Sequence, residues 1–188
     1  MSNRSNRRNS RMSKHITVAI DKCVGCHTCE LACAIEHSES GDVELMAIRG
    51  EKPSYRLNVE YYSGHPVPVN CQHCDDPACV HACPTGAVSR LATGKPVLVD
   101  DARCIGCSMC VQACPFGMMA MKEDGSTAIK CDLCVRRLAR GDQPACVASC
   151  PTSALFFEEE EVQNRAKRIQ AAERLVSAQE KAEVQEIS

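Results

Sequence analysis

The sequence has few of the residues that build a large apolar core. Among its 188 residues there are three phenylalanines, three tyrosines and no tryptophan. Aromatic side chains supply much of the buried area in ordinary domains, so a core built with so few of them is thin. We therefore expect apolar packing alone to give this fold little cohesion.

Long apolar runs and recognisable catalytic groupings are also missing. No run approaches the roughly 20 apolar residues that a transmembrane helix needs, so we predict that the chain itself does not span a membrane. No glycine-rich loop of the nucleotide-binding kind is present, so we expect any flavin or NAD to be bound by another protein. Because no set of acid, base and nucleophile stands out either, we predict a chain that is not an enzyme on its own.

Cysteine, in contrast, is abundant and regularly spaced. The 16 cysteines fall into four groups of four. In chain order, the groups are Cys23, Cys26, Cys29 and Cys33; Cys71, Cys74, Cys79 and Cys83; Cys104, Cys107, Cys110 and Cys114; and Cys131, Cys134, Cys146 and Cys150. The first and third groups read C-x2-C-x2-C-x3-C, and three of the four groups end in Cys-Pro. This is the thiolate spacing of bacterial ferredoxins, so the sequence predicts four 4Fe-4S clusters with these cysteines as ligands.

The spacing suits this cofactor for a geometric reason. Each iron of a 4Fe-4S cluster needs one protein ligand, and soft thiolates meet that need. Two residues between ligands let one tight loop reach three irons, while a cysteine from another group reaches the fourth iron. Gly25 and Gly106 stand between the first two ligands of their groups, where a residue without a side chain lets the backbone approach closely.

Other uses of cysteine fit less well. Disulfide scaffolds are usually short secreted chains with a signal peptide, and no signal peptide is visible in this sequence. Structural zinc favours separated C-x2-C pairs; the fourth group alone would pass for such a site, but the whole set does not. The six histidines are interpreted as surface or loop residues, since every group is complete without them. Reduced cysteines that hold clusters point to the cytoplasm.

The formal charge argues against nucleic acid as a partner. The sequence carries a net charge of −2. An oxidised cluster with its four thiolates adds about −2, so four of them bring the total to about −10 (−2 plus four times −2).

The separations between groups predict the fold. Twenty residues lie between Cys83 and Cys104, which is enough for a compact unit with a hairpin, whereas 37 lie between Cys33 and Cys71. The longer insert contains an alternating strand pattern at 55–61. We therefore predict an α+β fold at 14–157 with two fused ferredoxin-like units around four clusters: an inner unit from groups two and three, and an outer unit from groups one and four.

The two ends differ in composition from the cysteine-rich part. Residues 1–13 are basic without an acidic residue, and we predict a disordered tail there; no apolar stretch follows its arginine pair, and Met12 is an alternative start. Residues 158–188 have no glycine, proline or cysteine and are predicted to form a helical arm. Its apolar stripe consists of Val162, Ala166, Ile169, Ala172 and Val176. Two interpretations stay open: a solvated helix lying on its own domain, or an arm that docks on another protein.

Three stretches resemble a known family. They are CQHCDDPACVHACPTGAV at 71–88, CIGCSMCVQACPFG at 104–117, and KCDLC with GDQPACVASCPTSAL within 130–155. They resemble the four-cluster iron–sulfur subunits of the dimethyl-sulfoxide-reductase type. That family also includes small ferredoxin-like subunits of formate hydrogenlyase, carbon monoxide dehydrogenase and tungsten aldehyde oxidoreductase systems. The resemblance covers about residues 14–157 and implies a nested exchange of ligands between the two units.

The resemblance also implies which cysteines share a cluster. The four sets, each named by its first member, are the Cys23 set (Cys23, Cys26, Cys29 and Cys150), the Cys131 set (Cys131, Cys134, Cys146 and Cys33), the Cys71 set (Cys71, Cys74, Cys79 and Cys114) and the Cys104 set (Cys104, Cys107, Cys110 and Cys83). One departure is Ala34, where ferredoxins typically have proline. It leaves the exit turn after Cys33 less fixed without threatening ligation.

The leading hypothesis is a non-catalytic electron-transfer subunit. Its clusters pass single electrons between a catalytic oxidoreductase subunit and a second redox partner. The resemblance implies a catalytic subunit of the molybdenum or tungsten, hydrogenase or carbon monoxide dehydrogenase type. The alternatives are a free, diffusible polyferredoxin and a conductive scaffold that self-assembles through the carboxyl-terminal helix.

Overall fold

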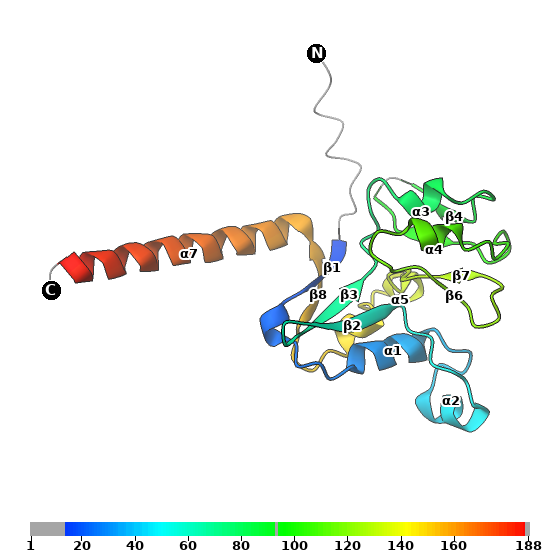
Figure 1. The fold of residues 1–188 in the computed structure, drawn as a ribbon. Coiled ribbons are helices and arrows are strands. Elements are labelled where there is room, and N and C mark those ends of the chain that lie inside the picture. The colour runs from blue at the N-terminus through cyan, green and yellow to red at the C-terminus, as the bar shows by residue number, and fades with distance from the viewer. Residues whose placement is uncertain (1–13, 93, 187–188) are drawn as a thin grey trace, which may run out of the picture.

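The computed structural model describes residues 14–92 and 94–186, and a strand pair joins the two ends of the cysteine-rich part (Figure 1). Strand β1 (Lys14–Val18) pairs antiparallel with β8 (Leu155–Glu159), with Val18 opposite Leu155. Because β1 leads into the first cysteine group and β8 leaves the fourth, this pairing brings those groups together. The predicted tail at 1–13 lies outside the described residues.

Between these strands the chain alternates short helices with short hairpins. In order, the elements are η2 (Ile20–Lys22), α1 (Thr28–Glu36), α2 (Val43–Arg49), β2 (Leu57–Tyr62), β3 (His65–Asn70), α3 (Ala78–His81), β4 (Val88–Arg90), β5 (Val97–Val99), α4 (Met109–Ala113), β6 (Ala120–Met121), β7 (Ala128–Ile129), α5 (Val135–Ala139) and α6 (Ala145–Ala148). The strands of the described residues form four two-stranded sheets: β1 with β8, β2 with β3, β4 with β5, and β6 with β7. The mixture of helices and strands agrees with the predicted α+β class.

Two small apolar cores hold these elements. One core gathers buried residues from β1, α1, β2 and β8, among them Ile16, Leu57 and Leu155. The other gathers buried residues of the hairpins between groups two and four, among them Val88 and Met119. Cysteines from all four groups lie in these cores or pack against them. Both cores are thin, as the scarcity of aromatic residues predicted.

Helix α7 (Glu160–Glu186) projects away from the rest of the molecule (Figure 1). It begins two residues later than the predicted arm because Glu158 and Glu159 continue β8, where they pair with His15 and Lys14. In the described part of the chain, no helix is long and apolar enough to cross a membrane.

Candidate iron–sulfur sites

The two C-x2-C-x2-C-x3-C groups fold into the same local structure. In each, a glycine and the residue two positions later take left-handed conformations. The φ angle is 66° at Gly25 and 58° at His27, and it is 69° at Gly106 and 60° at Ser108. Helices α1 and α4 begin directly after these turns. Each loop therefore reverses sharply between its first and third cysteines, which lets three side chains face one centre.

Gly106 is crowded as well as left-handed, so we expect Gly106→Ala to break its loop. A methyl group at this position would lie 2.6 Å from the backbone oxygen of Gly125. We expect the variant to lose about four of about sixteen iron atoms, one cluster's share, in a colorimetric iron assay. Gly117 is the matched control: its φ is 64°, but an added methyl meets nothing within 4 Å. Gly117→Ala costs about 1–2 kcal/mol of backbone strain and keeps its iron. Equal iron in the two variants would contradict the role of the close approach.

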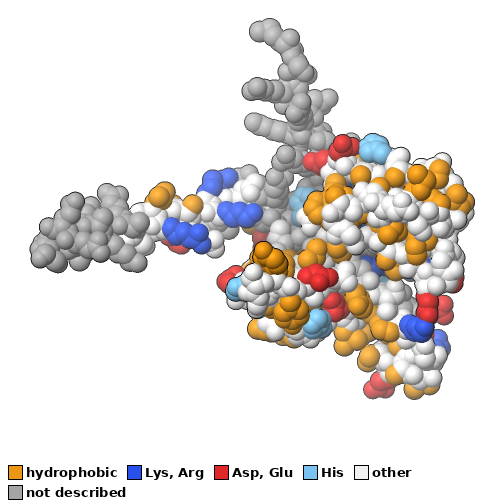
Figure 2. Space-filling view, viewed as in Figure 1, with side chains coloured by type: hydrophobic (Ala, Val, Ile, Leu, Met, Phe, Trp, Pro, Cys, Tyr) orange, Lys and Arg blue, Asp and Glu red, His pale blue; other side chains and the backbone are white. Residues whose placement is uncertain are grey.

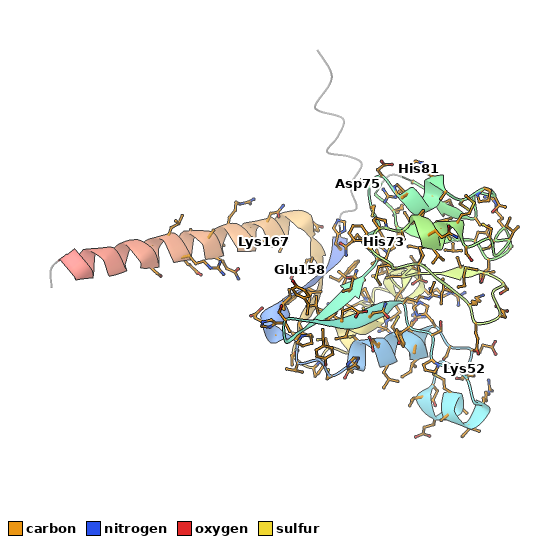
Figure 3. All side chains as sticks on the ribbon, viewed as in Figure 1. Lys52, His73, Asp75, His81, Glu158 and Lys167 are labelled. Atoms are coloured by element: carbon orange, nitrogen blue, oxygen red, sulfur yellow. The ribbon has the colours of Figure 1, made fainter. Side chains whose placement is uncertain are left out.

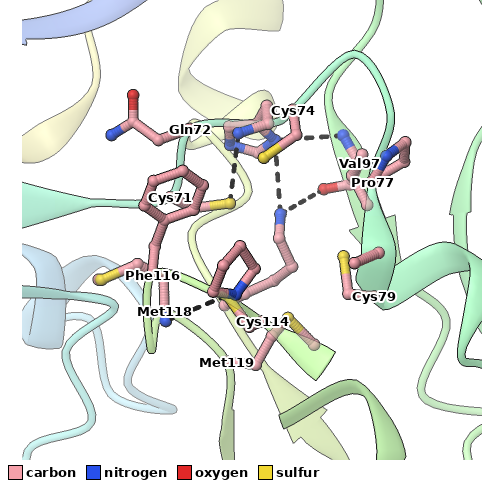
Figure 4. A pocket seen from close by; sticks show the side chains of 14 residues that line it. Cys71, Gln72, Cys74, Pro77, Cys79, Val97, Cys114, Phe116, Met118 and Met119 are labelled. Carbon is pink, nitrogen blue, oxygen red and sulfur yellow. Dashed lines mark hydrogen bonds between the residues drawn. The ribbon is translucent and has the colours of Figure 1, made fainter. Parts of the chain in front are cut away.

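The Cys71 set lines one cavity (Figure 4). Three of its cysteines come from the second group, and Cys114 is the last cysteine of the third. Apolar side chains, including Val97, Phe116 and Met119, complete the wall. Burial raises the pKa of the Cys79 thiol, and the negative charges of Cys71 and Cys114 raise it further. The four sulfurs therefore face a common, partly desolvated space.

The Cys104 set lines a second cavity in the reciprocal way. Three of its cysteines come from the third group, and Cys83 is the last cysteine of the second. Burial raises the pKa of the Cys110 thiol, with smaller contributions from the charges of Cys104 and Cys83. Each of these two cavities is therefore lined by three cysteines of one group and the last cysteine of the other.

The Cys131 set gathers where α1 packs against α6. This packing places Cys33, from the first group, in one core with Cys146. Burial raises the pKa of the Cys146 thiol, and nearby thiolate charges raise it further. Among these thiolates, Cys131, Cys33 and Cys134 make the largest contributions to the rise in the pKa of Cys146. The last cysteine of the first group therefore lies among the first three of the fourth.

Cys150, the last cysteine of the fourth group, lies close enough to Cys26 for its charge to act on that thiol. The Thr28 hydroxyl donates to Cys26 Sγ at 3.4 Å and lowers the pKa of that thiol, while the charge of Cys150 acts in the opposite direction. Cys150 comes from the fourth group, 124 positions beyond Cys26 in the numbering (150 − 26). The structure thus brings the ends of the cysteine-rich part into one site, beside the β1–β8 pair.

Backbone amides point at the sulfurs of the cysteines that end groups two, three and four. The donors are Val88 to Cys83 Sγ at 3.4 Å, Met118 to Cys114 Sγ at 3.4 Å and Ala154 to Cys150 Sγ at 3.2 Å. Burial acts to raise the pKa of the Cys83 and Cys150 thiols, but these bonds and others nearby outweigh it and lower both. Such bonds stabilise thiolates and help to set the potentials of iron–sulfur clusters. Four thiolates around one centre with amides aimed at them fit a 4Fe-4S cluster.

The sulfur of Cys33 accepts a hydrogen bond from an amide outside the exit turn of its own group, and Ala34 explains why. Where Cys-Pro ends a group, proline stops the local helix. After Cys33, in contrast, α1 continues to Glu36, because alanine readily extends a helix. Cys33 Sγ instead accepts the N–H of Arg56 at 3.3 Å. The long insert before β2 therefore supplies the bond that an exit turn supplies in the other groups.

His37 and His73 lie in loops, as interpreted, but both side chains are largely covered and are not at the surface. His73 is 3% exposed, whereas His81 lies at the outer edge of the molecule (Figure 3). His37 donates from Nδ1 to the Cys33 carbonyl at 2.8 Å and from Nε2 to Asp132 at 3.1 Å. Burial acts to lower the pKa of His37, but these bonds outweigh it and raise it to about 9. The resulting ion pair ties α1 to the loop of the fourth group.

The chain matches two family models, and both describe a 4Fe-4S dicluster domain. One match covers residues 22–88 and the other covers residues 63–160. The chain is a member of the 4Fe-4S dicluster family. Its relatives are close enough in sequence to compare in detail.

Three proteins that are similar to this chain carry names that describe electron transfer, an iron–sulfur protein or a reductase. An iron–sulfur protein of Rhodospirillum rubrum is 42% identical over 148 residues, which is 72% of this chain and 76% of that protein. The thiosulfate reductase electron transfer subunit PhsB of Salmonella typhi is 40% identical over 146 residues, 76% of this chain and 75% of that protein. A subunit of the anaerobic dimethyl sulfoxide reductase of Escherichia coli (strain K12) is 38% identical over 144 residues, 72% of this chain and 68% of that subunit.

Membership of the dicluster family confirms the main predictions. Two dicluster domains and 16 cysteines fit four 4Fe-4S clusters. The names of the relatives confirm a non-catalytic electron-transfer subunit related to the dimethyl-sulfoxide-reductase type. They give no support to a free polyferredoxin or a self-assembling scaffold. The ligand sets and the domain limits stay predictions.

Proposed function

We propose that this chain relays single electrons through four bound clusters between a catalytic oxidoreductase subunit and a second redox partner. When bound, each 4Fe-4S cluster supplies a site that accepts and releases one electron. The observation that carries the relay is the exposure of two cysteines. All 16 cysteines lie in the described residues; Cys26 and Cys107 are exposed, and the others are partly or fully buried. Because these two belong to different sets, the chain offers two points of electron entry and exit.

The proposed ligands are the four sets, arranged in two fused ferredoxin-like units. The cavities lined by the Cys71 and Cys104 sets support the inner unit, which shares the core around Val88. The outer unit is supported by the charge of Cys33, which acts on the Cys146 thiol of the fourth group, and by the charge of Cys150, which acts on the Cys26 thiol of the first. This unit shares the core around Ile16. The proposed outer limits of this double unit are residues 14 and 157.

The sets have a proposed order within the relay: Cys104, Cys71, Cys131 and Cys23. The Cys104 and Cys71 sets share one core. Cys131 responds to the negative charge of Cys71, which supports the second step. Cys146 responds to the charge of Cys29, which supports the third. In this order the two exposed cysteines belong to the end sets, and the inner sets have no exposed cysteine.

Each end of the proposed relay carries an apolar contact surface. Val24 and Ile105 occupy the same place in their C-x2-C loops, and each is 65% exposed. Tyr61 lies beside the first loop, with its hydroxyl 3.5 Å from the Gly25 carbonyl. Hydrophobic side chains also gather over the region of α3 and α4 (Figure 2). Such surfaces suit protein partners that exclude water next to a cluster.

The proposed catalytic partner is a molybdenum or tungsten oxidoreductase subunit. The names of relatives from thiosulfate reductase and dimethyl sulfoxide reductase favour a reductase over a hydrogenase or carbon monoxide dehydrogenase. The proposed location is the cytoplasm, where thiols stay reduced.

A pair of charge substitutions tests the relay. Val24→Glu and Ile105→Glu each place a carboxylate at one proposed contact surface, and each should keep about sixteen iron atoms. We expect each to slow electron exchange with a different partner by about tenfold or more, measured by stopped-flow absorbance with the co-purified subunits. Leu91→Glu, at a residue that is 82% exposed, is the control and should change neither rate. If each of the two substitutions slows exchange with the same partner, the two-ended relay is contradicted.

A further inference from the structure

Two buried polar side chains lie between two cysteine sets, and the relay described so far does not use them. Lys130 and His73 are each 3% exposed. Both line the cavity of the Cys71 set, and Lys130 directly precedes Cys131. Lys130 is thus in contact with the Cys71 set through the cavity wall and next to the Cys131 set along the chain. One buried charge therefore acts on two sets at once.

The contacts of Lys130 are those of an ammonium group. Its Nζ donates to the Val97 carbonyl at 2.6 Å and to the Cys131 carbonyl at 2.7 Å, and it lies 3.4 Å from His73 Nδ1. An ammonium has three donors and no acceptor, which matches three acceptor atoms. None of these three atoms carries a charge. Because a buried charge is costly without a counter-charge, the thiolate sets on either side of Lys130 are suited to provide it.

The same contacts fix the proton on the His73 ring. The N–H of Val97 donates to His73 Nδ1 at 3.1 Å, and Lys130 faces the same atom. A ring nitrogen that accepts a hydrogen bond carries no proton, so the ring is neutral. With Nδ1 as an acceptor, the neutral ring carries its proton on Nε2. That buried Nε2 has no hydrogen-bond partner among the described residues, so one donor at the wall of the Cys71 cavity is left for a bound group.

We propose that Lys130 and His73 are positioning residues that raise the reduction potential of the cluster held by the Cys71 set. His73 Nε2 donates a hydrogen bond to that cluster. Lys130 holds the histidine tautomer and places one positive charge between the Cys71 and Cys131 sets, which favours the extra electron on both. The proposal rests on the ligand sets given under Proposed function. It makes the middle of the relay the easiest place to reduce among otherwise similar sites.

The size of the effect follows from Coulomb's law. A unit charge about 10 Å away, at an effective dielectric constant of about 20, changes a one-electron equilibrium constant by roughly an order of magnitude. For a one-electron couple, tenfold corresponds to about 59 mV. Removing the charge of Lys130 should therefore be visible in a redox titration at both neighbouring sets. Removing the His73 donor should have a smaller effect that is confined to the Cys71 set.

The experiment is a redox titration followed by electron paramagnetic resonance with site-assigned signals. Lys130→Met is expected to lower the reduction equilibrium constant of the Cys71 and Cys131 sets by about tenfold, or about 59 mV. The two end sets should change by less than about twofold. His73→Phe should lower the constant several-fold at the Cys71 set alone. Lys52→Met makes the same chemical change at an exposed residue that pairs with Glu123 and should shift nothing.

Iron content separates this inference from the proposed function. If the unaltered protein holds far fewer than about sixteen iron atoms, the proposed function fails first. The proposal is overturned if the variants keep their iron and their reduction equilibrium constants at the Cys71 and Cys131 sets stay within twofold of those of the unaltered protein. If Lys130→Met loses iron, Lys130→Gln keeps an amide donor without the charge, and an unshifted potential there overturns the proposal equally.

A measurement on the unaltered sequence completes the test. Pulsed electron paramagnetic resonance of protein labelled with 15N-histidine should show nitrogen coupling to the reduced cluster of the Cys71 set. Absence of that coupling overturns the hydrogen bond from His73 even if every variant loses iron.

Discussion

Replacing Cys150 by serine is expected to remove the cluster of the Cys23 set and to leave the Cys131 set loaded. By sequence, Cys150 belongs with Cys131, so a local arrangement predicts the opposite outcome. In the structure its charge acts on Cys26, and the Ala154 amide donates to its sulfur at 3.2 Å. We expect iron to fall from about sixteen to about twelve atoms per chain, with the site identified by Mössbauer and electron paramagnetic resonance spectra.

Cys146→Ser provides the matched control for that experiment. Cys146 lies in the same group, four positions before Cys150 (150 − 146), but it is buried next to Cys131, Cys33 and Cys134. Its replacement should damage the Cys131 set and spare the Cys23 set. The exchange of ligands would be refuted if both substitutions removed the same cluster.

Removing α7 is expected to leave all four clusters in place and to slow electron transfer between the partners. A stop codon after Glu159 keeps β8 and its pairing with β1 intact and removes no cysteine. Val162, Ile169 and Val176 recur every seven residues on one helix face, and each is at least 50% exposed. Burying three such side chains on a partner would contribute about 2–3 kcal/mol, or roughly 30- to 140-fold in affinity.

The truncated chain is compared with the full chain in two assays. Iron and visible absorbance should be unchanged, while turnover with the reconstituted partners should fall by tenfold or more at limiting concentration. A full-length variant with glutamine at 162, 169 and 176 should behave like the truncated chain, because it keeps the helix and removes only the stripe. If the truncated chain keeps full turnover, α7 is a solvated helix and not a docking arm. Loss of iron would show that α7 belongs to the cluster-binding core.

The cysteine loops were predictable because their information is local. Ligand spacing, the glycine between the first two ligands and the following apolar residues all lie within short stretches of sequence. The predicted strand at 55–61 appears as β2, which begins at Leu57. Helix α2 was missed, although Asp42 offered a signal: its carboxylate accepts the amides of Glu44 and Leu45 at 2.9 and 3.0 Å, a typical amino-terminal cap.

Contacts between distant segments could not be predicted from spacing. Lys130 contacts Val97 and His73, which lie 33 and 57 positions before it in the sequence. Nothing in the residue type or local pattern of either partner indicates this contact. The amide of Arg56 reaches Cys33 across 23 positions because α1 does not stop at Ala34. The sequence showed alanine at position 34, where ferredoxins typically have proline. Its consequence could not be predicted, because it depends on where the insert between groups one and two places the Arg56 amide.

The count of iron and acid-labile sulfide per chain tests the central claim most directly. The claim is that the 16 cysteines of this protein hold four 4Fe-4S clusters. After anaerobic purification, we expect about sixteen iron and about sixteen sulfide per chain, measured by mass spectrometry of the metal and by colorimetric sulfide assay. About eight of each, or zinc as the dominant metal, would contradict the account.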